Sequence, residues 1–244
     1  MLFVSGVPVG TDRDIQSWSV TLTNVIDMKK ILADGLMSED PCGFVEAAGF
    51  PCIEALRDRI QPEKWHPEGD SYVHTLLCLQ RAVDLGYSLE VRFAVLVHDL
   101  GKAITPDDEL PHHYNHEKLG VPLVEAFCDE MEVNSYTRAL AVACCREHLN
   151  VHRYEQMKPV KRVRLISRLR RDCANHDINT FICDAARVYQ CDAQGRGPDF
   201  VNKPYPQGVR LALNTLRIAS CEFDEDVSRQ KLEQLHASVI SSSN

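Results

Sequence analysis

The sequence feature that most constrains the fold is a histidine–aspartate doublet, His98 and Asp99, which ends the apolar run FAVLV at residues 93–97. A run of this kind packs inside a globular protein, and an unpaired carboxylate buried with it costs several kcal/mol. Asp99 therefore needs a partner in the interior. A divalent metal ion, which takes imidazole and carboxylate ligands, is a suitable one. The chain has to fold so that further ligands reach the end of this run.

The segments around the doublet have the pattern of helices. Residues 74–86 end at a glycine suited to a helix C-cap. Residues 88–101 begin with Ser88 and carry Glu90, a helix-start signature. A polar loop is expected over 102–114, and no convincing β alternation follows residue 30, so the sequence predicts an all-α fold, a compact helical bundle. Further helices are expected over about 25–40, 49–60, 115–131, 135–149, 159–174, 177–193, 207–220 and 224–241.

The composition excludes several classes of protein. The formal net charge of −8 argues against a chain that coats nucleic acid non-specifically. No apolar run approaches the roughly 18 residues of a membrane span, and the N-terminal segment lacks the basic region of a signal peptide. The ten cysteines form no C-x-x-C motif. Free, buried thiols in a reducing compartment are therefore expected, and we predict a cytoplasmic protein.

Candidate partners for the doublet lie at the ends of the expected helices. If residues 74–86 and 88–101 form an antiparallel hairpin, the start of the first faces the end of the second, which brings His74 to the doublet. Further downstream, HHYNH contains His116, REHLNVH contains His148, and YQCDAQGRG contains Asp192. Lys102, one turn beyond the doublet, could meet a substrate phosphate. These side chains suit one metal ion, or two ions that clamp a phosphoryl group.

The other histidines have simpler interpretations. We expect His66 to be a loop or capping residue, and His112 and His113 to be solvated in the polar loop. His152 could flank the site, and the last two histidines, His176 and His236, are expected at the surface.

Six segments, taken together, resemble a known family. They are KWHPEGDSYVHTLLCL, VRFAVLVHDLGKAITP, HHYNHEKLGVPLVEAF, REHLNVHRY, DAARVYQCDAQGRG and YPQGVRLA. The H…HD…D pattern resembles the HD phosphohydrolase superfamily. The order and spacing of the six segments, over about residues 62–220, resemble the C-terminal HD domain of bacterial CCA-adding enzymes (tRNA nucleotidyltransferases).

The resemblance implies a metal site and an activity. The first metal would be held by residues matching His74, His98, Asp99 and Asp192. A second metal would add His116 and His148, with Asp99 bridging, and in a site with one metal either histidine could protonate the leaving group. Lys102 and Arg196 would contact the substrate phosphate. The implied substrates are 2′,3′-cyclic nucleotides, 2′-nucleotides and simple phosphate esters. The metal stays open among Ni, Mn, Co, Mg, Fe and Zn.

The sequence also departs from the full-length tRNA enzymes. We expect residues 1–60 to be an N-terminal extension of loop and short helices, too short for a nucleotidyltransferase domain, and residues 61–244 to be the HD domain. The expected protein is a stand-alone hydrolase without nucleotidyltransferase activity.

Alternative functions stay open at this point. The chain could be an HD-type nucleotidase, a dNTP hydrolase or a signalling-nucleotide phosphodiesterase. It could also be a tRNA-binding module without catalysis, contacting RNA through the basic helix at 158–171, although a solvated helix face explains that segment equally well. HD domains often pair, so a homodimer is a further expectation.

Overall fold

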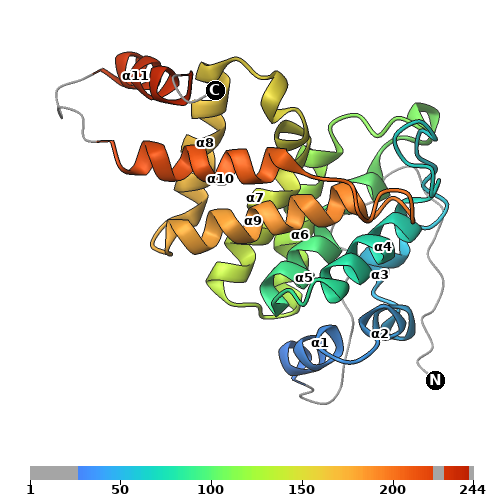
Figure 1. The fold of residues 1–244 in the computed structure, drawn as a ribbon. Coiled ribbons are helices and arrows are strands. Elements are labelled where there is room, and N and C mark those ends of the chain that lie inside the picture. The colour runs from blue at the N-terminus through green and yellow to red at the C-terminus, as the bar shows by residue number, and fades with distance from the viewer. Residues whose placement is uncertain (1–26, 222–227, 242–244) are drawn as a thin grey trace.

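A computed structural model describes residues 27–221 and 228–241, and they form an all-α bundle, as predicted. Figure 1 shows α9 and α10 side by side, with α11 against α8 and with α1 and α2 at the opposite end of the molecule. The α-helices are α1 (Met28–Leu36), α2 (Pro41–Ala48), α3 (Pro51–Glu54), α4 (Ser71–Asp84), α5 (Leu89–Val97), α6 (His116–Glu130), α7 (Ser135–His152), α8 (Pro159–Cys173), α9 (Ile178–Gln194), α10 (Pro206–Ala219) and α11 (Arg229–Ser241).

Most of the expected helices are present, and the differences have local causes. Pro41 begins α2 instead of only ending the helix before it, because proline suits the first helical position and Asp40 caps the Gly43 amide. The expected helix over 49–60 shortens to α3. The expected loop over 102–114 contains two short 3₁₀ helices, η2 (Leu100–Ile104) and η3 (Asp107–Glu109). Residues 1–26 of the expected extension lie outside the described residues.

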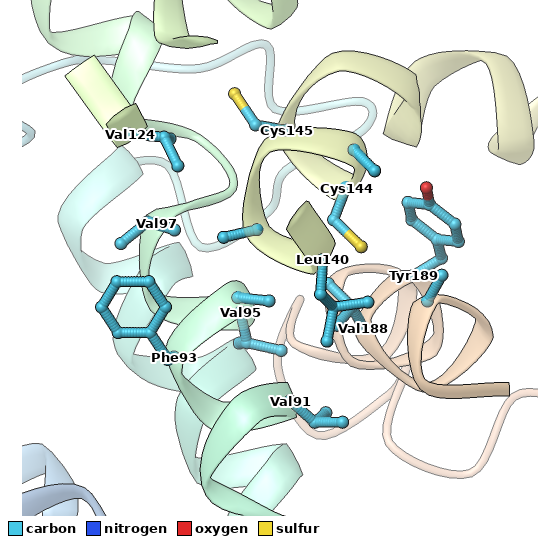
Figure 2. Close-up of a cluster of buried hydrophobic side chains, with 14 of the residues drawn as sticks. Val91, Phe93, Val95, Val97, Val124, Leu140, Cys144, Cys145, Val188 and Tyr189 are labelled. Atoms are coloured by element: carbon cyan, nitrogen blue, oxygen red, sulfur yellow. The ribbon is translucent and has the colours of Figure 1, made fainter. Parts of the chain in front are cut away.

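The helix that carries the doublet lies at the centre of the bundle. Every residue of α5 from Val91 to Val97 is buried, as expected for a helix that is apolar on all sides. Figure 2 shows Phe93, Val95 and Val97 packed among side chains of α6, α7 and α9. The α-helix ends at Val97, and His98 is its C-cap. The prediction that this helix continues to residue 101 is therefore wrong, because the chain tightens there into η2.

The N-terminal helices pack against this same core. Leu36, Val45 and Ile53 are fully buried and belong to one cluster with the core side chains of α4 and α5. The buried guanidinium of Arg92 donates through Nη1 to the carbonyl of Leu36 at 2.8 Å, which ties α1 to α5. The boundary between residues 60 and 61 stays a prediction. Among the described residues, no helix is both long and apolar enough to cross a membrane.

A close backbone approach positions the start of α6 against the doublet. A β-carbon on Gly101 would clash with the carbonyl oxygen of His116 and would lie 2.6 Å from the backbone nitrogen of Gly120. Only glycine lets η2 approach α6 so closely. The imidazole of His116 thus reaches Asp99 because residue 101 has no side chain.

We expect Gly101→Ala to lower the free energy of unfolding by at least about 3 kcal/mol, because both clashing groups are backbone and cannot rotate away. Gly49→Ala is the control, since Gly49 has a φ of 59° with nothing within 4 Å of an added β-carbon. It should cost about 1–2 kcal/mol, the strain of a left-handed residue. Urea unfolding followed by circular dichroism measures both. Equal losses would contradict this account of Gly101.

Candidate metal centre

The six predicted metal ligands converge at helix ends, and all six are buried. Four of these residues lie in four different helices, and the other two, His98 and Asp99, directly follow α5. His74 lies in the first turn of α4, His98 caps α5, and Asp99 precedes η2. The other three are His116 at the start of α6, His148 in the last turns of α7 and Asp192 near the end of α9.

One oxygen of Asp99 faces two of the histidines. Asp99 Oδ2 lies 3.3 Å from His98 Nε2 and 3.8 Å from His74 Nε2. Asp192 completes this group, with Oδ1 at 3.3 Å from His74 Nε2 and Oδ2 at 3.9 Å from His98 Nε2. We call these residues, His74, His98 and Asp192, the inner group.

The other oxygen of Asp99 faces a different pair. Asp99 Oδ1 lies 3.3 Å from His116 Nε2 and 3.5 Å from His148 Nε2. The two imidazole nitrogens are 3.0 Å from each other. We call Asp99, His116 and His148 the outer group. Asp99 therefore joins the two groups through its two oxygens, the arrangement expected of a bridging carboxylate.

Hydrogen bonds fix the tautomer of all four histidines. His98 Nδ1 lies 2.7 Å from the Val95 carbonyl oxygen, and the corresponding nitrogens of His116 and His148 lie 2.6 and 2.8 Å from the carbonyls of His113 and Cys145. His74 Nδ1 lies 2.7 Å from a carboxylate oxygen of Glu68. Because these oxygens only accept, each ring carries its proton on Nδ1. In its neutral form, a ring of this tautomer directs the lone pair of Nε2 towards Asp99 or Asp192.

This set of donors fits a divalent metal ion. Among the described residues, His98 Nε2 and Asp99 Oδ1 are buried without a hydrogen-bond partner, and such groups need an explanation such as an ion. Two lone pairs 3.0 Å apart, on His116 and His148, repel each other unless a cation lies between them. Nitrogen and oxygen ligands of a tetrahedral zinc ion stand about 3.4 Å apart, given bonds of about 2.1 Å. The 3.3 Å separations match that spacing.

The pKa values of the group agree with binding of a cation. Burial opposes charge on Asp99, yet His98 and Lys102 outweigh it and hold the carboxyl pKa well below its usual range. Burial likewise opposes charge on His98, but Asp99 and Asp192 outweigh it and raise its pKa to about 9, so a metal ion that binds Nε2 has to displace a proton from it. Burial lowers the pKa of His148 to about 3. His148 is therefore neutral near pH 7 and able to act as a ligand.

Lys102 lies beneath the doublet instead of facing solvent. Its side chain is buried, and Nζ is 2.5 Å from both Asp99 Oδ2 and Gln61 Oε1. In this position the ammonium group keeps Asp99 ionised and fixes its orientation. The contact between Lys102 and a substrate phosphate stays a prediction, since the structure pairs the ammonium group with Asp99.

Arg196 lies beside the inner group with a free donor. Its Nη2 is 3.4 Å from Asp192 Oδ1, and its Nη1 donates to the carbonyl of Trp65 at 3.3 Å. Its Nε is buried and has no hydrogen-bond partner among the described residues. A guanidinium N–H without a protein acceptor, next to a candidate metal ligand, is suited to a phosphate oxygen.

Two residues near the site were not recognised from the sequence. Glu68 has a buried carboxylate that joins His66 Nδ1 at 2.8 Å to His74 Nδ1 at 2.7 Å. The sequence signal for it is the segment HPEGD, which comes just before His74. Gln61 accepts from Lys102, and nothing in its neighbourhood marks it in advance.

The remaining histidines are placed differently from some of the expectations. His66 is half-buried on Glu68, and burial lowers its pKa to about 3. His113 is buried between Thr105 and the carbonyl of Ile60, so the prediction that it is solvated is wrong. His112 is exposed, as expected. His152 flanks the inner group, with Nε2 at 2.6 Å from Asp192 Oδ2. His176 and His236 are half-buried.

The basic segment at 158–171 forms α8, and the protein itself binds part of its charge. Arg162 is buried and donates to two carbonyl groups, those of Met157 and Glu155. Arg168 makes a two-pronged contact with Glu147, and Arg164 pairs with Glu233 of α11. Five basic side chains of the segment are exposed, namely Lys158, Lys161, Arg164, Arg170 and Arg171, and of these Arg164 is the one that pairs with Glu233.

Comparisons with known proteins find an HD domain in this chain. A family model described as the HD domain matches residues 71–175. The chain is 42% identical over 178 residues to the Multifunctional CCA protein of Acinetobacter baumannii strain ATCC 17978, covering 72% of this chain and 42% of that protein. It is 39% identical over 188 residues to that of Paraburkholderia phytofirmans, covering 73% and 44%. The chain thus spans less than half the length of these curated relatives. No solved structure matches it.

Glu68 should tune the metal affinity of the inner group through His74. We expect Glu68→Ala to weaken divalent metal binding about 10- to 100-fold, because the ring of His74 loses the acceptor that orients it. Glu68→Gln, which keeps an acceptor oxygen, should lose less. Glu63→Ala is the control, since Glu63 is an exposed carboxylate of the same loop. Isothermal titration with Mn²⁺ or Co²⁺ measures the affinity. Equal affinity in Glu68→Ala and wild type would exclude this role.

Proposed function

We propose that this chain is a metal-dependent phosphohydrolase of the HD type that hydrolyses phosphoesters of nucleotides. The match of residues 71–175 to the HD domain supports this proposal. The type of reaction that we favour is that of a 2′,3′-cyclic phosphodiesterase, 2′-nucleotidase and phosphatase. Support comes from the similarity to Multifunctional CCA proteins over about 70% of the chain, because the matching motifs follow that group and not only the wider family.

One observation carries the proposal: the two oxygens of a single buried carboxylate, Asp99, face two separate sets of imidazole lone pairs. A divalent ion bound here lowers the pKa of a bound water towards neutrality and polarises a phosphoryl oxygen. His74, His98, Asp99 and Asp192 would hold one ion. Asp99, His116 and His148 would hold a second.

The side chains around these ligands prepare the site for an anionic substrate. The guanidinium of Arg196, whose Nη2 lies 3.4 Å from Asp192 Oδ1, would contact a phosphoryl oxygen and stabilise the charge that develops in the transition state. Lys102 keeps Asp99 ionised through a 2.5 Å contact. Burial lowers the pKa of His148 to about 3, which favours its role as a neutral metal ligand.

We expect His98→Ala and Asp99→Ala each to lower kcat/KM for 2′,3′-cyclic AMP by about 1,000-fold or more. This corresponds to the loss of about 4 kcal/mol of transition-state stabilisation when a catalytic ion loses a ligand. Activity measured with and without added Mn²⁺, Co²⁺ or Ni²⁺ tests the expectation. His112→Ala, at an exposed histidine, is the matched control. Helical circular dichroism must be unchanged, and retained activity in both variants would refute the site.

Other nucleotide phosphoesters define the competing proposals. An HD-type nucleotidase, a dNTP hydrolase or a signalling-nucleotide phosphodiesterase would use the same residues. A panel of 2′,3′-cyclic, 3′,5′-cyclic, mono- and triphosphate nucleotides separates them. Preference for a triphosphate or a 3′,5′-cyclic nucleotide would replace the substrate proposed here. A homodimer stays a prediction, to be measured by light scattering in the same samples.

Contact with tRNA is a second proposal, favoured by the exposed cations of α8. Each phosphate contact adds about 0.9 to the slope of log affinity against log salt for a duplex. We expect a steep slope for tRNA binding, and a variant with Lys158, Lys161, Arg170 and Arg171 all changed to glutamine should flatten it. Replacing Lys29 and Lys30 of α1 is the control. Absence of binding by the wild type at low salt would eliminate this contact.

A further inference from the structure

A buried cysteine lies against the inner group. Cys78 is four residues after His74 on α4, so both side chains occupy one face of that helix. Its side chain is fully buried, and its Sγ lies 3.4 Å from His74 Nε2. No motif in the sequence distinguishes this cysteine from the other nine. The helix register and the packing of α4 on α9 bring it to the site.

The distances suit a sulfur ligand. One donor atom from each of His74, Cys78, His98 and Asp192 lies within 4.8 Å of all the others. In tetrahedral zinc sites with bonds of about 2.1 Å to nitrogen and about 2.3 Å to sulfur, the two donors stand about 3.6 Å apart. The observed 3.4 Å between Sγ and His74 Nε2 is close to that value. His98 is 1% exposed, and its Nε2, one of these four ligand atoms, has no hydrogen-bond partner among the described residues.

The surrounding backbone holds the thiol in place. Gly195 caps α9 directly against Cys78, where an added β-carbon would lie 2.7 Å from the Cys78 Cα and would clash with Sγ. The thiol therefore has little room to turn towards α9. Besides His74, the sulfur has a second polar neighbour among the described residues. This is the carbonyl oxygen of Asp192, which lies 3.9 Å from Sγ.

The two groups then differ in donor chemistry. With Cys78, the inner group offers two imidazoles, the carboxylate of Asp192 and a sulfur beside Asp99 Oδ2, whereas the outer group offers two imidazoles and the other oxygen of Asp99. Cysteine sulfur is a common ligand of protein-bound zinc. Soft thiolate ligands favour zinc and related ions over magnesium or calcium.

We propose that Cys78 is a ligand of the inner group and makes that group selective for a thiophilic ion such as Zn²⁺ or Co²⁺. On binding, the sulfur forms the bond to the metal and its proton passes to solvent. The inference rests on the proposed function, because it concerns the same metal centre. It adds a ligand and a metal preference that the HD motif does not contain.

Cobalt titration of the full chain, after removal of metals with a chelator, tests the proposal. Wild type should develop the near-ultraviolet charge-transfer band of a sulfur–cobalt bond together with visible ligand-field bands. Cys78→Ser and Cys78→Ala should lack the charge-transfer band and bind Co²⁺ and Zn²⁺ about 10- to 100-fold more weakly, with Mn²⁺ affinity changed much less. Cys128→Ser, at a buried cysteine of α6, should keep the band.

The outcomes separate this inference from the proposed function. Visible bands without a charge-transfer band in wild type would overturn the role of Cys78 and leave the phosphohydrolase proposal standing. A charge-transfer band that survives in both Cys78 variants, each checked by circular dichroism, would assign the sulfur to another cysteine and would also overturn it. Failure of wild type to bind Co²⁺ at all would refute both proposals.

Discussion

The burial of one carboxylate governs the rest of this structure. Asp99 lies at the end of α5, which is buried on all sides, so its charge has to be balanced inside the protein. Lys102 supplies one balancing charge at 2.5 Å. Imidazole nitrogens surround the remaining sides of the carboxylate at 3.3 to 3.8 Å. These distances exceed those of good hydrogen bonds and match the spacing of ligands about a metal ion.

The helix ends supply the means of orienting these ligands. His98, His116 and His148 each donate from Nδ1 to a carbonyl three residues earlier, so the backbone of α5, of the segment just before α6 and of α7 fixes the three rings. His74 uses the carboxylate of Glu68 instead. The ring orientation follows from local backbone geometry, and the meeting of the rings follows from packing. A bundle in which α5 is central brings the ends of α4, α6, α7 and α9 to one place.

Sequence patterns could predict the fold class and the main ligands, because both depend on local and periodic signals. Apolar periodicity shows helices, and a charged doublet that interrupts it shows a buried site. The patterns could not predict that Lys102 turns back to Asp99, or that His113 is buried, because both depend on Gln61, Thr105 and the close packing at Gly101. Pro41 was ambiguous for a similar reason, since proline can precede or begin a helix.

By itself, the sequence determined an all-α chain with an HD motif and six candidate metal ligands at helix ends, because residue type and spacing along a helix carry that information. Only the tertiary structure decided that Asp99 divides its oxygens between two groups of donors, that Glu68 supports His74, and that Cys78 lies within reach of the inner group. These relations join residues on different helices or in the loop before α4. Their distances are set by side-chain packing across the bundle, which no pattern along one segment records.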